Sequence, residues 1–219
     1  MLLNTGDKLV MIGDSVTDVE RAQPVGEGLF GAIGKGYVAM VDALLATAYP
    51  DRRLRVVNMG NSGNTVRDLK TRWQRDVLDL HPDWLSIMIG INDVWRQFDM
   101  PLQMETHVPL AEYEATLDEL VAQSLPHLKG LVLLTPYYIE PNAGDLMRAR
   151  MDEYGAAVKR VATRRQTLLV DTQAAFNAFL QHYHSSYLAW DRVHPTPVGH
   201  MLLARTFLHA IGYQWQGEV

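Results

Sequence analysis

Five short apolar runs, separated by longer amphipathic segments, constrain the fold of this chain most strongly. Each run is rich in Leu, Ile and Val and is continuous rather than alternating, which is typical of strands buried on both faces. The runs cover residues 8–12, 54–58, 84–89, 131–135 and 168–170. Strands that alternate with helices predict a parallel sheet covered by helices on both faces. We therefore expect a three-layer α/β/α, flavodoxin-like, doubly wound sheet of five parallel strands in the order 2-1-3-4-5.

The segments between the runs carry apolar residues at helical spacing. The predicted helices cover residues 37–48, about 64–80, 110–125, 147–164 and 197–211. A chain of 219 residues suits one domain, so we expect residues 1–219 to form a single unit.

Composition narrows the classes of function. The net charge of −5 offers no basic surface for nucleic acid, and the absence of cysteine excludes disulfides and thiol chemistry. No basic, apolar leader is visible at the N-terminus, and no apolar stretch approaches the length of about 20 residues that crosses a membrane. We therefore expect a cytoplasmic protein that contacts neither nucleic acid nor membrane.

Polar residues follow the first three predicted strands, at the edge where such sheets bind ligands. They are the segments 13–15, 60–64 and 90–93. Because strands one and three are neighbours in the expected order, Ser15 and Asn92 are predicted to lie side by side.

Ser15, Asp191 and His194 supply the parts of an acyl-transfer triad. A serine hydroxyl attacks poorly without a general base, and His194 is the best candidate among the eight histidines. Asp191, three residues earlier, can accept the other ring N–H and steady the imidazolium. The competing interpretation is that Ser15 is only a helix N-cap.

A tetrahedral intermediate also needs donors aimed at its oxyanion. The candidates are the backbone N–H of Ser15, a glycine N–H from the loop between Gly60 and Gly63, and the side-chain amide of Asn92. Taken singly, Asn92 could close an Asx turn and Gly63 could form a tight turn before a helix. From the residues alone, the choice between the two glycines stays open.

In four blocks, the chain resembles the SGNH (GDSL-type) hydrolases over essentially its whole length. The blocks are Gly13-Asp14-Ser15, Gly60-x-x-Gly63, Gly90-x-Asn92-Asp93 and Asp191-x-x-His194-Pro195. The resemblance implies that Ser15 is the nucleophile, that Asp191 and His194 complete the triad, and that Ser15, Gly63 and Asn92 form the oxyanion hole. It favours Gly63 over Gly60, because the family's donor lies in a Ser-Gly-x-Thr-like stretch. It implies no metal or organic cofactor.

Within that family, the surrounding segments are similar to bacterial carbohydrate deacetylases of the acetylxylan-esterase type. The resemblance implies a serine esterase whose partner is a small-molecule ester, an acetylated sugar such as an acetylated xylo-oligosaccharide. The alternative is a broad-specificity, short-chain or lysophospholipase-like esterase. Trp95 and Trp190 are candidate substrate-binding residues, because indole faces suit sugar rings or a small acyl pocket. Trp215, near the C-terminus, is expected either to contact another subunit of a homo-oligomer or to lie in a short C-terminal segment that packs on its own domain.

Other classes fit the sequence less well. The Gly-x-Ser-x-Gly elbow of α/β-hydrolases is absent, since the segment around Ser62 fails at its last position. The segment from Gly13 to Asp18 resembles a metal-binding block of haloacid-dehalogenase-type phosphatases, but it stands too early in the chain. His182 and His184 lack carboxylate partners for a metal site. A non-catalytic binding module would be expected to lose Ser15, Asn92 or His194.

Overall fold

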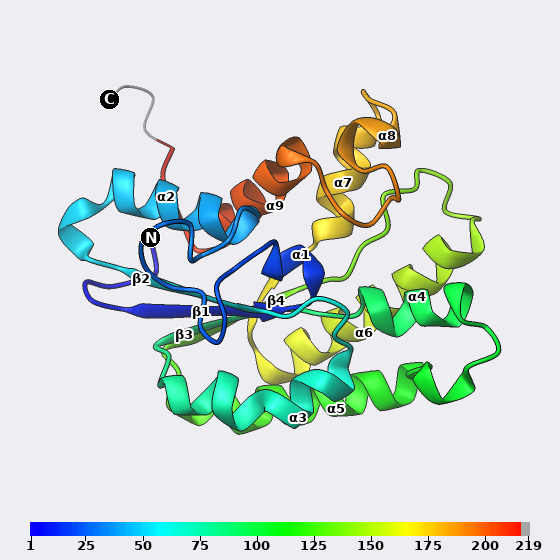
Figure 1. Ribbon diagram of the computed structural model, residues 1–219, viewed down its shortest axis with the longest axis horizontal. Coiled ribbons are helices and arrows are strands. Elements are labelled where there is room, and N and C mark those ends of the chain that lie inside the picture. The colour runs from blue at the N-terminus through cyan, green and yellow to red at the C-terminus, as the bar shows by residue number, and fades with distance from the viewer. Residues whose placement is uncertain (216–219) are drawn as a thin grey trace.

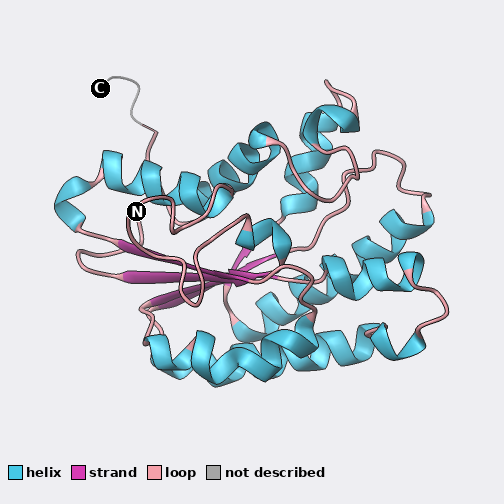
Figure 2. Cartoon of the chain, in the orientation of Figure 1, coloured by secondary structure: helices cyan, strands magenta, loops and turns pink. Residues whose placement is uncertain are grey.

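A single sheet of five parallel strands forms the middle layer of the structure (Figure 2). This computed structural model describes residues 1–215, so positions 216–219 of the predicted domain lie outside the described residues. The strands are β1 (Lys8–Gly13), β2 (Arg55–Gly60), β3 (Trp84–Met88), β4 (Gly130–Leu134) and β5 (Leu168–Val170). Their order is β2-β1-β3-β4-β5, which confirms the predicted fold and its switch point between β1 and β3. That residues 1–219 form one domain stays a prediction.

Helices cover both faces of this sheet (Figure 1). On one face α2 packs against α9 and α9 against α7; on the other face α3 packs against α5, and α6 packs against both α5 and α4. The helices are α1 (Ser15–Asp18), α2 (Tyr37–Ala48), α3 (Val66–Asp76), α4 (Ile91–Asp99), α5 (Leu110–Ser124), α6 (Leu146–Arg165), α7 (Thr172–Leu180), α8 (Ser185–Leu188) and α9 (Pro197–Ala210).

The strands are mostly apolar because helices cover both faces of the sheet. Every residue of β3 is buried, and in β1 only Lys8 is partly exposed. The register aligns the carboxyl ends of three strands, since Gly13 at the end of β1 pairs with Gly60 on one side and Met88 on the other. The loops that follow these three strands therefore start from one edge.

Several regions differ from the sequence prediction, which includes no helix over α4, α7 or α8. The helix expected over residues 64–80 ends at Asp76, and a 3₁₀ turn over Leu78–Leu80 follows it. The segment after β3 was predicted only as a polar loop, yet it forms α4 and places Asn92 in the first helical turn. The apolar side chains of Ile91 and Val94, one helical turn apart, are both buried and account for this short helix.

Candidate active site

The turn after β1 presents Ser15 at the start of α1. The N-cap of this helix is Asp14, whose Oδ1 accepts a hydrogen bond from the N–H of Val16 at 3.0 Å. The interpretation of Ser15 as the N-cap is therefore wrong, and its hydroxyl is left available. Gly13 has no room for a side chain, because a Cβ there would lie 2.3 Å from the carbonyl oxygen of Met88.

His194 lies against Ser15 from a distant part of the chain. Its Nε2 atom is 2.9 Å from Ser15 Oγ, and its Nδ1 atom is 2.6 Å from Asp191 Oδ2. The other carboxylate oxygen of Asp191 accepts hydrogen bonds from the N–H groups of Val193 (2.9 Å) and His194 (2.8 Å). The structure thus brings the three predicted triad side chains into one hydrogen-bonded chain.

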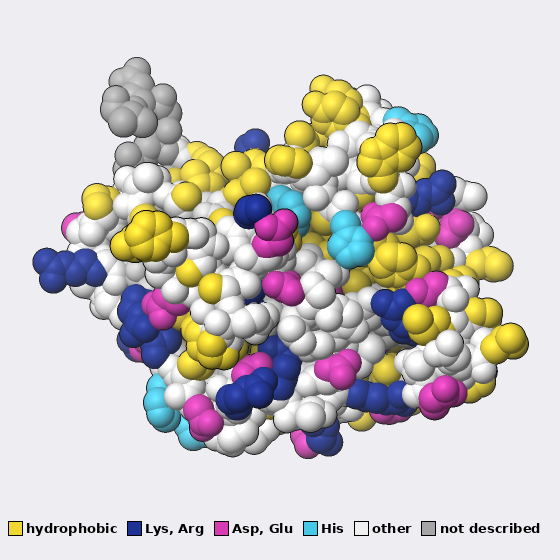
Figure 3. All heavy atoms as spheres, in the orientation of Figure 1, with side chains coloured by type: hydrophobic (Ala, Val, Ile, Leu, Met, Phe, Trp, Pro, Cys, Tyr) yellow, Lys and Arg dark blue, Asp and Glu magenta, His cyan; other side chains and the backbone are white. Residues whose placement is uncertain are grey.

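The charge of Asp191 is set by these contacts. Partial burial raises the pKa of this carboxyl, but the hydrogen bonds from His194 and Val193 outweigh it and hold the pKa below its usual value. An ionised Asp191 fixes the tautomer of His194 with the proton on Nδ1, which leaves Nε2 free to accept a proton. Histidine side chains reach the surface beside α1 (Figure 3), and the side chain of His194 is about half exposed.

The segment that carries Asp191 and His194 connects α8 to α9 and is held from the loop after β4. The hydroxyl of Tyr137 donates to the carbonyl of Val193 at 2.9 Å, and the N–H of Ile139 donates to the carbonyl of Arg192 at 2.9 Å. Arg192 also forms an ion pair with Glu140 at 2.7 Å. Residues 137–140 therefore position the segment that carries His194.

The loop after β2 distinguishes the two candidate glycines. The N–H of Gly60 donates to Asn58 Oδ1 at 2.9 Å, so this donor is already engaged. Gly63 lies further along the loop with φ of +82°, in the left-handed region where glycine is favoured. The next residue, Asn64, accepts a hydrogen bond through its carbonyl oxygen from Asn92 Nδ2 at 2.9 Å. The loop of Gly63 and the side chain of Asn92 are thus in direct contact.

Two buried carboxyls lie beneath this site. Burial raises the pKa of Asp14 to about 7 and that of Asp93 to about 7. Asp93 Oδ1 accepts a hydrogen bond from the N–H of Val66 at 3.0 Å, which ties the start of α3 to α4. Its other oxygen, Oδ2, is buried without a hydrogen-bond partner.

The tryptophans differ in environment. Trp95 is partly buried, and its ring centroid lies 5.8 Å from that of His194. Trp190 is 90% exposed. Trp215 packs on its own chain, with the guanidinium of Arg205 5.2 Å from its ring centroid.

The residues behind the metal-dependent alternatives have other contacts. Asp18 Oδ2 accepts hydrogen bonds from the N–H and the hydroxyl of Ser62, and His184 caps α8. Over residues 1–215 we find no group of three or more His, Asp or Glu side chains arranged to hold a metal. In the same range no helix is long and apolar enough to cross a membrane.

Sequence reasoning missed Arg72 and Asn64. Arg72 is buried in α3 and its Nε donates to Asn64 Oδ1 at 2.7 Å. A signal was present, because a charged residue stands directly before Trp73 and three positions after Leu69, within the apolar stripe of the helix.

Comparison with known proteins gives a consistent result. Residues 11–202 match the GDSL-like Lipase/Acylhydrolase family. The chain is 58% identical to an acetylxylan esterase from Geobacillus stearothermophilus over 215 residues, 98% of each chain.

Solved structures agree with this match. The crystal structure of Axe2, an acetylxylan esterase from that organism, superposes with a TM-score of 0.97 at 57% identity over 100% of both chains. Structures of Axe2 also include the catalytic mutants S15A, D191A and H194A. LAE5, an alpha/beta hydrolase enzyme from the metagenome of Lake Arreo, is 58% identical with a TM-score of 0.97, over 99% of this chain and 100% of that one.

Proposed function

Because the chain belongs to the GDSL-like lipase/acylhydrolase family, we propose that it is a serine esterase that removes acetyl groups from carbohydrate esters. Axe2, its relative of 57% identity, is described as an acetylxylan esterase and as an acetyl-xylooligosaccharide esterase. The observation that carries the proposal is the hydrogen-bonded chain Ser15–His194–Asp191, with heavy-atom distances of 2.9 and 2.6 Å.

The proposed reaction has two halves. Ser15 Oγ attacks the ester carbonyl while His194 Nε2 takes the hydroxyl proton, and the resulting imidazolium is stabilised by Asp191. Collapse of the tetrahedral intermediate breaks the bond to the sugar oxygen, which leaves with the proton from His194. Water then attacks the acetyl-enzyme with His194 again as base, releasing acetate and restoring Ser15.

The oxyanion of each intermediate is assigned to the N–H groups of Ser15 and Gly63 and to the side-chain amide of Asn92. Two contacts support this assignment. The single N–H of Gly60 is engaged by Asn58, whereas the amide of Asn92 has two N–H donors, of which the carbonyl of Asn64 binds one and so orients the other. Donors that are already in place stabilise the transition state most when they point at the atom on which negative charge develops.

Trp95 and Trp190 are proposed to contact the substrate in different ways. The ring of Trp95 beside His194 is suited to border the acetyl group. The exposed indole of Trp190, next to Asp191, offers a flat apolar face to a sugar ring.

The central test is hydrolysis of p-nitrophenyl acetate and release of acetate from acetylated xylo-oligosaccharides. We expect Ser15→Ala to abolish both activities and a fluorophosphonate probe to label Ser15, as located by mass spectrometry. His182→Ala is the matched control for His194→Ala and should retain activity. Activity that survives Ser15→Ala but is lost with EDTA would contradict the proposal. Faster turnover of octanoyl than acetyl esters would favour the broad-specificity alternative.

The proposal includes a cytoplasmic location, where the substrates would be short oligosaccharides, and cell fractionation followed by the acetate assay tests it. It also includes self-association into a homo-oligomer. Light scattering coupled to size-exclusion chromatography gives the number of copies directly.

A further inference from the structure

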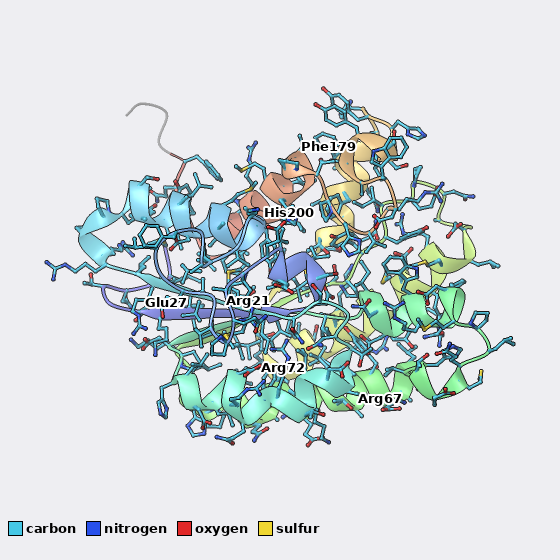
Figure 4. The ribbon with its side chains drawn as sticks, viewed as in Figure 1. Arg21, Glu27, Arg67, Arg72, Phe179 and His200 are labelled. Atoms are coloured by element: carbon cyan, nitrogen blue, oxygen red, sulfur yellow. The ribbon has the colours of Figure 1, made fainter. Side chains whose placement is uncertain are left out.

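Arg72 occupies the junction between the turn that carries Ser15 and the loop that carries Gly63. It extends from α3 toward the sheet (Figure 4) and is only 8% exposed. Burial of a guanidinium is unfavourable unless its donors find acceptors. The acceptors of the Arg72 guanidinium therefore indicate which parts of the site this side chain holds in place.

The guanidinium of Arg72 binds the ends of two strands at once. Its Nη2 donates to the carbonyl of Gly13 at 3.0 Å, two residues before Ser15, and its Nη1 donates to the carbonyl of Met59 at 2.8 Å. These two carbonyls lie at the carboxyl ends of β1 and β2. Arg72 thus fixes where the nucleophile turn starts relative to the neighbouring loop.

The third contact reaches the proposed oxyanion donors. Arg72 Nε donates to the side chain of Asn64 at 2.7 Å, and the main-chain carbonyl of Asn64 accepts the hydrogen bond from Asn92 Nδ2 at 2.9 Å. Asn64 directly follows Gly63. One side chain is therefore connected to all three groups assigned to the oxyanion: to Gly63 and Asn92 through Asn64, and to Ser15 through Gly13.

Asp76 balances the charge of this arrangement. Its Oδ2 accepts a hydrogen bond from Arg72 Nη1 at 2.9 Å. Burial acts to raise the pKa of Asp76, but hydrogen bonds from Arg75 and Arg72 hold it below its usual value. Arg75 binds the same carboxylate from the surface, and its side chain is 76% exposed.

Only arginine can make this set of contacts. The planar guanidinium carries five donors in a fixed fork, whereas the ammonium of lysine places its donors at a single point. We propose that Arg72 is a positioning residue that holds the N–H groups of Ser15 and Gly63 and the amide of Asn92 in register around the oxyanion. This inference rests on the proposed esterase function.

The first test compares Arg72→Lys with Arg75→Lys, which alters the same ion-pair cluster from outside. A small displacement of catalytic groups is costly, so kcat for p-nitrophenyl acetate should fall about 10- to 100-fold in Arg72→Lys with little change in KM. Arg75→Lys should keep wild-type kcat. Affinity for a trifluoromethyl ketone, whose adduct with the serine carries an oxyanion, should fall in parallel with kcat.

A second variant covers the case in which Arg72→Lys does not fold. Asn64→Ala keeps the main-chain carbonyl that Asn92 binds but removes the acceptor of Arg72 Nε. Loss of this one hydrogen bond should lower kcat about fivefold. In the double variant the effects should not add, because both changes break the same connection.

The outcomes separate this inference from the proposed function. Wild-type kcat in a folded Arg72→Lys variant, together with inactive Ser15→Ala, would overturn the positioning role alone. A fall in kcat without loss of ketone affinity, or wild-type kinetics in Asn64→Ala, would overturn it as well. Activity in Ser15→Ala would instead overturn the esterase mechanism itself.

Discussion

His194 Nε2 lies 2.9 Å from Ser15 Oγ, although 179 positions separate the two residues in the chain. The serine stands at the end of the first strand, and the histidine stands on a connection between two late helices. Neither is useful without the other, because the hydroxyl needs a base within hydrogen-bond distance. The proposed chemistry therefore depends on the complete fold.

Replacement of Asp191 by Asn should lower kcat for p-nitrophenyl acetate by about 10⁴-fold. The amide would remove the negative charge that stabilises the imidazolium and would no longer select the tautomer of His194. Steady-state kinetics measure the effect. Asp51→Asn, in the exposed 3₁₀ turn before β2, is the control and should behave as the wild type. A loss below about tenfold for Asp191→Asn would contradict the assigned role.

Asn92→Ala should reduce kcat by about 10²- to 10³-fold, with a smaller effect on KM, since the amide is proposed to donate to the oxyanion. The side chain is buried, so thermal unfolding must show that the variant is folded at the assay temperature. Asn177→Ala, on the exposed side of α7, serves as the comparison. If Asn92→Ala raised KM and left kcat intact, the amide would be binding ground-state substrate instead.

Trp190→Ala should distinguish recognition of the sugar from recognition of the acetyl group. Loss of the exposed indole is expected to raise KM for an acetylated xylo-oligosaccharide about fivefold, and to leave p-nitrophenyl acetate unaffected because that ester carries no sugar. Trp95→Ala, beside His194, should alter both substrates. Equal effects of Trp190→Ala on the two esters would count against stacking on the sugar.

Asp93→Asn should change how stability depends on pH. Burial raises the pKa of Asp93 from 3.8 to about 7, so between these values the folded protein retains a proton that the unfolded chain has lost. The free energy of unfolding consequently falls as the pH rises through this window. In Asp93→Asn the slope should be less negative by about 1 kcal/mol per pH unit.

Urea unfolding of the wild type and of Asp93→Asn at several pH values from 4 to 8 gives the slope of the free energy of unfolding against pH. The difference is expected between pH ~4 and ~7, the range between the two pKa values of Asp93. The substitution keeps an oxygen for the N–H of Val66, so the local contact survives. Parallel curves for wild type and variant would show that Asp93 is ionised in the folded protein throughout.

The sequence was sufficient to predict the sheet because its strands are buried on both faces. A continuous apolar run such as the one in β3 leaves little choice of environment. The alternation of such runs with helical segments favoured a doubly wound sheet, and the strand order is the one that the flavodoxin-like class has. The close approach of Ser15, His194 and Asp191 could also be predicted, since an acyl-transfer triad requires these particular residue types.

Other features depend on contacts that sequence patterns do not encode. The choice between Gly60 and Gly63 was left open by the residues themselves, and the relevant contact is the hydrogen bond between the N–H of Gly60 and Asn58. The helix α4 spans nine residues, and its apolar residues Ile91, Val94, Trp95 and Phe98 stand at helical spacing. The sequence prediction treats the residues after β3 only as a polar ligand-binding segment and does not use this spacing. The role of Arg72 could not be predicted because two of its acceptors are main-chain carbonyls from two strands, which become neighbours only after folding.

The connection between α8 and α9 is fastened to residues 137–140 by two hydrogen bonds and one ion pair, rather than by strand pairing. Segments held in this way exchange their amide hydrogens through local opening events that leave the sheet intact. Each such event would carry His194 away from Ser15. On heating, the protein should therefore lose activity a few degrees below the temperature at which the whole domain unfolds. The stability of the connection between α8 and α9, more than that of the core, would set the highest temperature at which the enzyme works.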